Sequence, residues 1–123
     1  MTDPTFTERE LDIMSVLWQR GSGSVAEVRQ SLGDSVGYTT VLKLLQILEE
    51  KGAVRHEEEG RAYRYFPLVE RGRAGGNALT RILDKIFGGS AELLLSQLVS
   101  DREIPAEELA RMRRILEETE EEP

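Results

Sequence analysis

The spacing of apolar residues changes from a helical to a strand-like period at Gly52, and this change constrains the fold more than any other feature. Before Gly52 the apolar side chains recur at intervals of three and four residues, which places them on one helix face: Val41, Leu44, Leu45 and Leu48. After it, residues 53–57 and 61–66 have a period of about two, which is typical of strands. Residues 58–60 supply a turn. The sequence therefore predicts a helix followed directly by a two-stranded hairpin.

Two capping boxes predict two shorter helices before this one. Thr7 is followed three residues later by Glu10, and apolar residues at helical spacing come after them. Ser24 and Glu27 repeat the same spacing. A short helix that meets the next across a brief turn is a helix-turn-helix, and a hairpin that follows it is a wing. We therefore expect residues 1–70 to form a winged helix-turn-helix domain that binds DNA.

The outward face of the third helix is polar, yet its N-terminal half has no Glu and only one Lys, Lys43, although these residue types usually cover a solvated helix. Hydroxyl, amide and ammonium groups can contact phosphate oxygens and base edges when a helix N-terminus approaches a duplex. The alternative interpretation is an ordinary amphipathic helix. The DNA contacts predicted from this helix are Tyr38, Thr39, Thr40, Lys43 and Gln46.

The predicted wing contributes three arginines. Its turn is acidic at residues 57–59, so its tip is a poor ligand for phosphate. Arg55, Arg61 and Arg64 are the better candidates for phosphate contacts. His56 is the only histidine and has no companion ligands, so we expect an exposed strand residue and no metal site.

Residues 71–123 predict a helical region whose apolar stripes have no further layer to cover them. Residues 68–76 are charged and rich in glycine, and they form either a junction or a loosely held helix start. Helical spacing resumes at Asn77, and the acidic residues 117–123 are expected to fray. Three helices folded on themselves are one interpretation, but a homodimer doubles the core. The expected dimer interface consists of Leu79, Ile82, Leu83, Ile86, Phe87, Leu94, Leu95, Leu98, Leu109, Met112 and Leu116.

Composition narrows the classes of function. The formal net charge of −7 argues against nucleic acid at first sight, but phosphate binding needs local cations and not a basic total. The chain has no cysteine, which excludes disulfides, thiolate metal sites and a cysteine nucleophile. No apolar run approaches the roughly 20 residues of a membrane span. We expect an intracellular, cytoplasmic protein without membrane insertion or cofactor.

In this order, the motifs resemble the penicillinase-repressor (BlaI/MecI) family of winged-helix transcriptional regulators. The matching stretches are residues 7–18, 38–52, 63–67 and 83–90, and the resemblance covers about residues 6–118. It implies homodimers that bind dyad-symmetric operators and repress genes for antibiotic resistance or related envelope functions. It also implies that Thr39, Thr40, Lys43 and Gln46 face the major groove, with Arg61 and Arg64 on phosphates.

Three departures from the family pattern limit what the resemblance carries over. Leu42 stands where some relatives have arginine, so the base preference is expected to differ. Copper-responsive relatives end in cysteine pairs, and this chain has none. The best-known relatives are inactivated by a regulatory protease at an Asn-Phe bond, which a sensor pathway triggers. Ser96-Gln97 aligns with that bond, so we expect the cleavage signal to be lost. Release of the repressor by a ligand or by another protease is then the expected route.

The predicted protein is therefore mainly α-helical with a small β-hairpin: a winged helix-turn-helix domain plus a C-terminal helical dimerisation region. We expect a homodimeric DNA-binding repressor. The alternative is a winged-helix protein-interaction module without specific DNA binding, which the acidic balance favours. A small hydrolase or metal enzyme is a third class. The sequence shows no acid pair, nucleophile with a base or phosphate-binding glycine loop at a spacing that supports catalysis.

Overall fold

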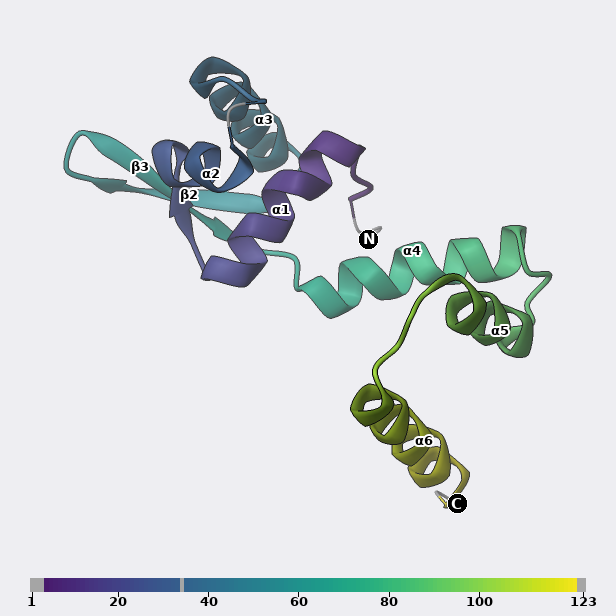
Figure 1. The fold of residues 1–123 in the computed structure, drawn as a ribbon. Helices are drawn as coiled ribbons and strands as arrows, with labels where there is room; N and C mark the ends of the chain where they lie inside the picture. The colour runs from purple at the N-terminus through teal and green to yellow at the C-terminus, as the bar shows by residue number, and fades with distance from the viewer. Residues whose placement is uncertain (1–3, 34, 122–123) are drawn as a thin grey trace. The chain divides into compact units, whose positions relative to one another are not determined.

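The computed structural model describes residues 4–33 and 35–121, and over these ranges it is mainly helical with one small sheet (Figure 1). The elements in chain order are α1 (Glu8–Arg20), β1 (Gly23–Ser24), α2 (Val25–Leu32), α3 (Tyr38–Glu50), β2 (Val54–Glu59), β3 (Ala62–Pro67), α4 (Arg71–Lys85), α5 (Ala91–Asp101) and α6 (Ala106–Glu121). The chain divides into two compact units, Met1–Ala78 and Leu79–Pro123. This architecture confirms the predicted fold class.

Both capping boxes form as the sequence predicts. The hydroxyl of Thr7 accepts a hydrogen bond of 3.2 Å from the backbone N–H of Glu10, whose carboxylate accepts one of 2.8 Å from the N–H of Thr7. Ser24 and Glu27 make the same reciprocal pair, at 3.2 and 3.0 Å. These bonds satisfy N–H groups that a helix start leaves without partners, which fixes where α1 and α2 begin.

The sheet has three antiparallel strands in the order β1-β3-β2, so the prediction of a two-stranded hairpin was incomplete. In the additional pairing, Gly23 lies opposite Tyr65 and Ser24 opposite Arg64. A strand of two residues shows no period, so spacing alone does not reveal it. A Cβ atom at residue 23 would lie 3.2 Å from Cγ2 of Val28, so glycine allows β1 to approach α2 closely.

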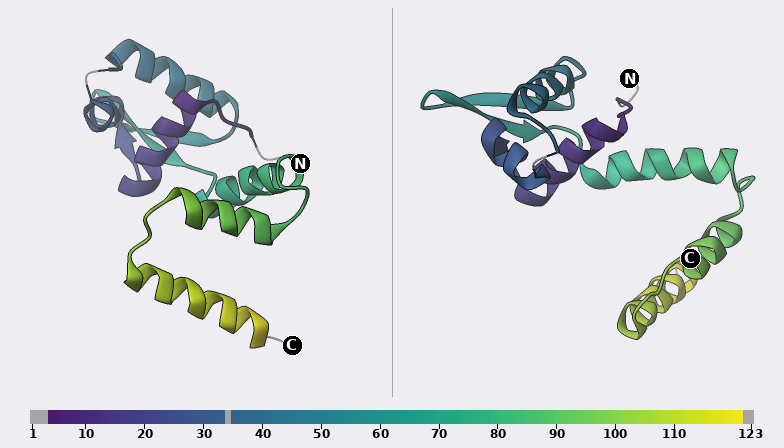
Figure 2. Two further views of the ribbon diagram at one scale, coloured as in Figure 1. Left: turned by 45° about the vertical axis from the view of Figure 1, so that its right-hand side comes forward. Right: turned by 45° about the horizontal axis from the view of Figure 1, so that its top comes forward.

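Helices α1, α2 and α3 gather against the sheet, and the β2–β3 hairpin projects beyond them (Figures 1 and 2). Leu11, one of the apolar residues after the first capping box, is 42% exposed. Trp18 is half-buried, and its indole N–H donates a 2.7 Å hydrogen bond to the carbonyl of Val69, just after β3. The buried apolar residues are Ile13, Met14, Val16, Leu17, Val25, Val28, Val36, Val41, Leu45, Leu48, Ala53, Val54 and Tyr65.

An ion pair between a buried carboxylate and a more exposed ammonium joins the start of α1 to the end of α3. Glu10 is only 2% exposed, and its carboxylate lies 2.8 Å from the ammonium of Lys51. Lys51 also donates a 3.2 Å bond to the carbonyl of Thr5. Burial alone raises the pKa of Glu10, but the bonds from Lys51 and the backbone of Thr7 together outweigh it and leave this pKa below its ordinary value.

We expect this pair to make the fold sensitive to acid. A carboxyl whose folded pKa is depressed stabilises the fold fully above its unfolded pKa, about 4.5, and loses that contribution as the pH falls through the folded pKa. Glu10→Gln should therefore lower the free energy of unfolding by about 1–3 kcal/mol near neutral pH, because Lys51 loses its charged partner. The difference from the wild type should shrink below about pH 4.

Urea unfolding followed by circular dichroism at several pH values measures both quantities. Glu8→Gln is the matched control, because Glu8 lies in the same helical turn and is exposed. A difference between Glu10→Gln and the wild type that stays constant with pH would show that ionisation of Glu10 does not stabilise the fold.

The three C-terminal helices bury none of their described residues. Leu93 in α5, for example, is 57% exposed. The helix predicted from Asn77 in fact begins at Arg71, so the glycine-rich residues 71–76 are helical. The acidic end expected to fray is helical as far as Glu121. None of the described helices is long and apolar enough to span a membrane.

Candidate nucleic-acid interface

The outward face of α3 carries the polar residues that the sequence singled out. Val41, Leu45 and Leu48 point into the core with no exposed surface. Among the described residues, no side chain caps the N-terminus of α3, which follows Gly37, so the first backbone N–H groups and the positive end of the helix dipole remain available. The exposed residues on this helix include Tyr38, Thr39, Thr40, Lys43 and Gln46. This helix end can therefore present hydroxyls, an amide and positive charge to an anionic, hydrogen-bonding surface.

Two of the predicted cations are available for an external partner. Lys43 and Arg61 are exposed, and neither side chain has an ion-pair partner within residues 4–33 and 35–121. Arg61 lies in the turn between β2 and β3, so it is carried by the projecting hairpin. Their charges are free to neutralise phosphate.

Arg55 is only partly available. Its guanidinium lies 2.8 Å from the carboxylate of Glu57 and 4.3 Å from the centre of the Phe66 ring. Both contacts are within the wing, where Arg55 and Phe66 are opposite each other on β2 and β3. The side chain remains 48% exposed, so a phosphate contact would compete with Glu57.

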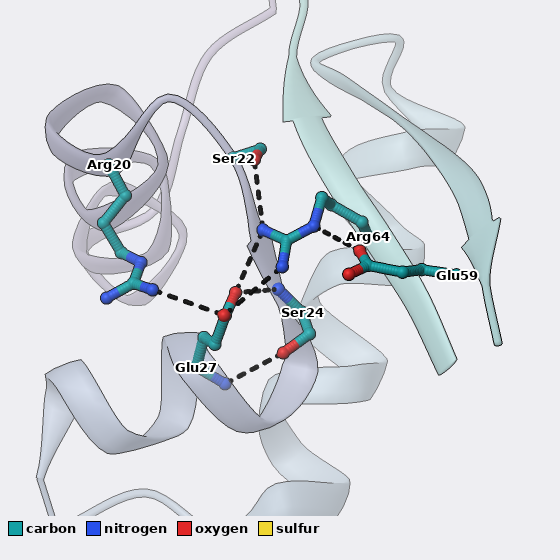
Figure 3. A network of polar contacts seen from close by, with 6 residues as sticks. All are labelled: Arg20, Ser22, Ser24, Glu27, Glu59 and Arg64. Carbon is teal, nitrogen blue, oxygen red and sulfur yellow. Dashed lines mark hydrogen bonds and ion pairs between the residues drawn. The ribbon is translucent and has the colours of Figure 1, made fainter. Parts of the chain in front are cut away.

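Arg64 differs most from the expectation of a phosphate contact. Its guanidinium is bound to three side chains from other parts of the domain, Ser22, Glu27 and Glu59 (Figure 3). Glu59 and then Glu27 raise the pKa of Arg64 above its ordinary value. The backbone N–H of Ser24 and then Arg64 lower the pKa of Glu27. The positive charge of Arg64 is thus largely neutralised within the protein.

His56 links the wing to the end of α3. Its Nδ1 atom lies 2.7 Å from both carboxylate oxygens of Glu49, and its ring centre is 4.5 Å from Tyr63 and 5.6 Å from Tyr65. Burial and then the charge of Glu49 raise the pKa of Tyr65. In the described part of the chain, no group of three His, Cys, Asp or Glu residues is arranged to hold a metal ion.

One further cation was missed in the sequence. Arg29 lies in α2 one turn after the buried Val25, but its side chain is exposed, and no ion pair holds it within the described ranges. The first helix of a helix-turn-helix crosses the DNA backbone. From this general geometry, Arg29 could have been predicted as a phosphate contact, together with Lys43 and Arg61.

The family model of penicillinase repressors matches residues 6–118 of this chain. The penicillinase repressor of Bacillus licheniformis is 26% identical over 117 residues, which cover 94% of this chain and 91% of the relative. The solution structure of the DNA-binding domain of the repressor BlaI has a TM-score of 0.53 and 30% sequence identity, and covers 58% of this chain and 90% of that one. The family and sequence matches thus cover nearly the whole chain, and the structural match covers 58% of it.

A second solved structure of that repressor includes DNA. It holds the monomeric form of Bacillus licheniformis BlaI in complex with the blaP half-operator, and it matches this chain with a TM-score of 0.50 and 30% identity. The alignment covers 58% of this chain and 90% of that chain. A relative with a similar DNA-binding domain therefore engages half an operator as one protomer.

Proposed function

This chain belongs to the penicillinase repressor family, and from that premise we propose that it acts as a homodimer on a dyad-symmetric operator. It is a DNA-binding transcriptional repressor. The observation that carries the proposal is the exposed polar N-terminal half of α3 in a fold that resembles a domain solved on half-operator DNA. We place its action in the cytoplasm, where operator DNA is accessible, and we propose no catalytic step.

The chemistry of α3 supports its role as the recognition helix. The recognition helix of a helix-turn-helix enters the major groove with its N-terminal residues on the base edges. Thr39, Thr40 and Gln46 can donate and accept hydrogen bonds there, with Tyr38 beside them. Lys43 would neutralise a phosphate, as would Arg29 from α2 and Arg61 from the wing; Arg55 would do so after leaving Glu57.

We expect base-reading and phosphate-neutralising residues to respond differently to the DNA sequence. Thr40→Ala and Gln46→Ala should weaken binding to the cognate site by about 1–3 kcal/mol each and change binding to random DNA little. Lys43→Ala should weaken both by a similar factor. Fluorescence anisotropy with two duplexes measures this, one taken from upstream DNA that the full chain protects and one of scrambled sequence. Equal losses on both duplexes for all three variants would contradict the proposed helix face.

The exposed apolar residues of the C-terminal helices support dimerisation. Of the eleven residues predicted for the interface, none is buried within a single chain. Isolated exposed leucines are ordinary, but stripes on successive helices are typical of surfaces that pair with another copy. The half-buried members are Leu83, Phe87, Leu94, Leu109 and Met112; the exposed members are Leu79, Ile82, Ile86, Leu95, Leu98 and Leu116.

We also propose that cleavage within α5 would release the repressor, with a regulatory protease or sensor as the partner. Ser96 and Gln97 lie inside this helix, where Ser100 donates a 2.8 Å bond to the carbonyl of Ser96 and Gln97 one of 2.8 Å to Asp101. A protease would have to unfold this turn to bind an extended backbone. Cleavage would detach α6 and its apolar residues from the proposed interface. A small ligand remains the alternative trigger.

A further inference from the structure

We propose that Arg64 is a positioning residue that fastens the wing to the start of α2, and that it does not neutralise a DNA phosphate. This inference rests on the proposed function, because the wing carries the phosphate-binding candidate Arg61. It assigns to Arg64 a role opposite to the one that its charge and its place in the wing suggest.

The guanidinium of Arg64 joins three segments of the domain (Figure 3). One terminal nitrogen lies 3.1 Å from the hydroxyl of Ser22 and 3.0 Å from Oε1 of Glu27, and the other lies 3.3 Å from Oε2 of Glu27. Its Nε donates to Glu59 at the far end of β2. This paired approach to one carboxylate is the geometry in which arginine binds strongly and directionally.

Glu27, the partner of Arg64 in α2, is itself held in place by other contacts. Glu27 closes the capping box with Ser24, and its Oε2 atom lies 3.4 Å from the guanidinium of Arg20 in α1. Ser24 lies opposite Arg64 in the β1–β3 pairing, so backbone and side-chain contacts meet at the same place. The position of β3 is thereby set relative to the first turn of α2.

The charges of this network cancel. Arg20 and Arg64 contribute two positive charges, and Glu27 and Glu59 contribute two negative charges. A phosphate that approached Arg64 would have to displace one or both carboxylates, leaving them beside the DNA. The side chain of Arg64 is only 25% exposed, whereas Arg61, three residues earlier, is exposed and has no ion-pair partner in the described chain.

Substitution of Arg64 separates the two roles, because lysine keeps the charge but not the planar fork. A phosphate contact tolerates lysine, since an ammonium also neutralises phosphate. A positioning role that needs two bonds to Glu27 and a third bond to Glu59 does not tolerate lysine, because an ammonium group cannot make this planar arrangement. We therefore expect Arg64→Lys and Arg64→Gln to weaken binding by the same factor, about three- to tenfold.

The experiment uses the full-length chain and a mixed-sequence duplex, with affinity measured between about 50 and about 200 mM salt. Both Arg64 variants should keep the wild-type slope of log affinity against log salt. Arg61→Gln is the control, and it should make the slope shallower by about 2, because each dimer loses two phosphate contacts. Arg64→Lys at wild-type affinity, with Arg64→Gln behaving as Arg61→Gln does, would overturn the inference.

Neighbouring glutamates on β2 provide a second test that keeps Arg64 intact. Glu59→Gln and Glu58→Gln remove the same charge from adjacent positions, but only Glu59 contacts Arg64. We expect Glu59→Gln to bind the duplex more weakly than Glu58→Gln. Tighter binding by Glu59→Gln, with a steeper slope, would show that Glu59 had been withholding Arg64 from phosphate. This comparison decides the inference if the Arg64 variants do not fold.

The wild type tests the proposed function separately. If the wild-type slope of log affinity against log salt were near zero, both the proposed DNA binding and the inference about Arg64 would be contradicted. A steep wild-type slope, combined with rescue by Arg64→Lys, would overturn the role of Arg64 alone.

Discussion

A fragment that ends at Ala78 is expected to fold as a monomer and to bind the operator about 10²- to 10⁴-fold more weakly than the full chain. The fragment keeps every member of the buried core cluster, from Ile13 to Tyr65, as well as the bond between Trp18 and Val69. It loses α5, α6 and the second half of α4. The second half-site would then no longer be held at a high effective concentration, although each protomer would keep its recognition helix.

Sedimentation and anisotropy measured on the same samples test this expectation. A full-length Leu98→Glu variant is a second route to the monomer, because Leu98 belongs to the proposed interface, and Gln97→Glu is its neighbour control. A fragment that remains dimeric would move the interface into the DNA-binding unit. A monomeric fragment with undiminished affinity would show that dimerisation does not contribute to operator binding.

The dependence of DNA binding on salt is the second large effect. Arg29, Lys43 and Arg61 have no ion-pair partner among the described residues, and on both protomers of the proposed dimer they would make six phosphate contacts. At about −0.9 per contact, the expected slope of log affinity against log salt is about −5. Between about 50 and about 200 mM salt, affinity should fall by about 10³-fold. A fourth cation on each protomer, either Arg55 after leaving Glu57 or Arg64, would bring the number of contacts to eight and give a slope of about −7.

The same titration decides between the repressor and the protein-interaction module. A net charge of −7 repels DNA at long range, so binding has to depend on local cations whose contacts release counterions. Lys43→Gln should make the slope shallower by about 2, and Arg9→Gln, in which the lost arginine was paired with Asp12, is the control. A slope near zero for the wild type would favour the interaction module.

Features that depend on neighbouring residues were predictable from the sequence. The capping box of Thr7 and Glu10 involves residues three apart, so its spacing is visible without a structure. The buried face of α3 follows from a helical period within a few turns, and its core residues Val41, Leu45 and Leu48 are buried as expected. The exposed face follows from the same geometry, because residues between the buried positions point outward.

Features that depend on distant parts of the chain were not predictable. Arg64 meets Glu27 and Ser22 across separations of 37 and 42 residues, and no local pattern indicates which carboxylates an arginine will find. Strand β1 is recognisable only by its pairing with β3. The start of α4 at Arg71 was left open for a different reason: the glycines at 72, 75 and 76 disfavour a helix, so they were consistent with either a junction or a loosely held helix start.

Because of the bond between Trp18 and Val69, the intrinsic tryptophan fluorescence of the protein reports on one defined site. Trp18 is the only tryptophan of the chain, so the long-wavelength fluorescence of the unlabelled protein comes from one place, where the chain leaves β3 for α4. Indole emission shifts in wavelength when its N–H bond or its contact with water changes. Events at this junction during operator binding or proteolysis can therefore be followed in real time, without a dye and without a substitution.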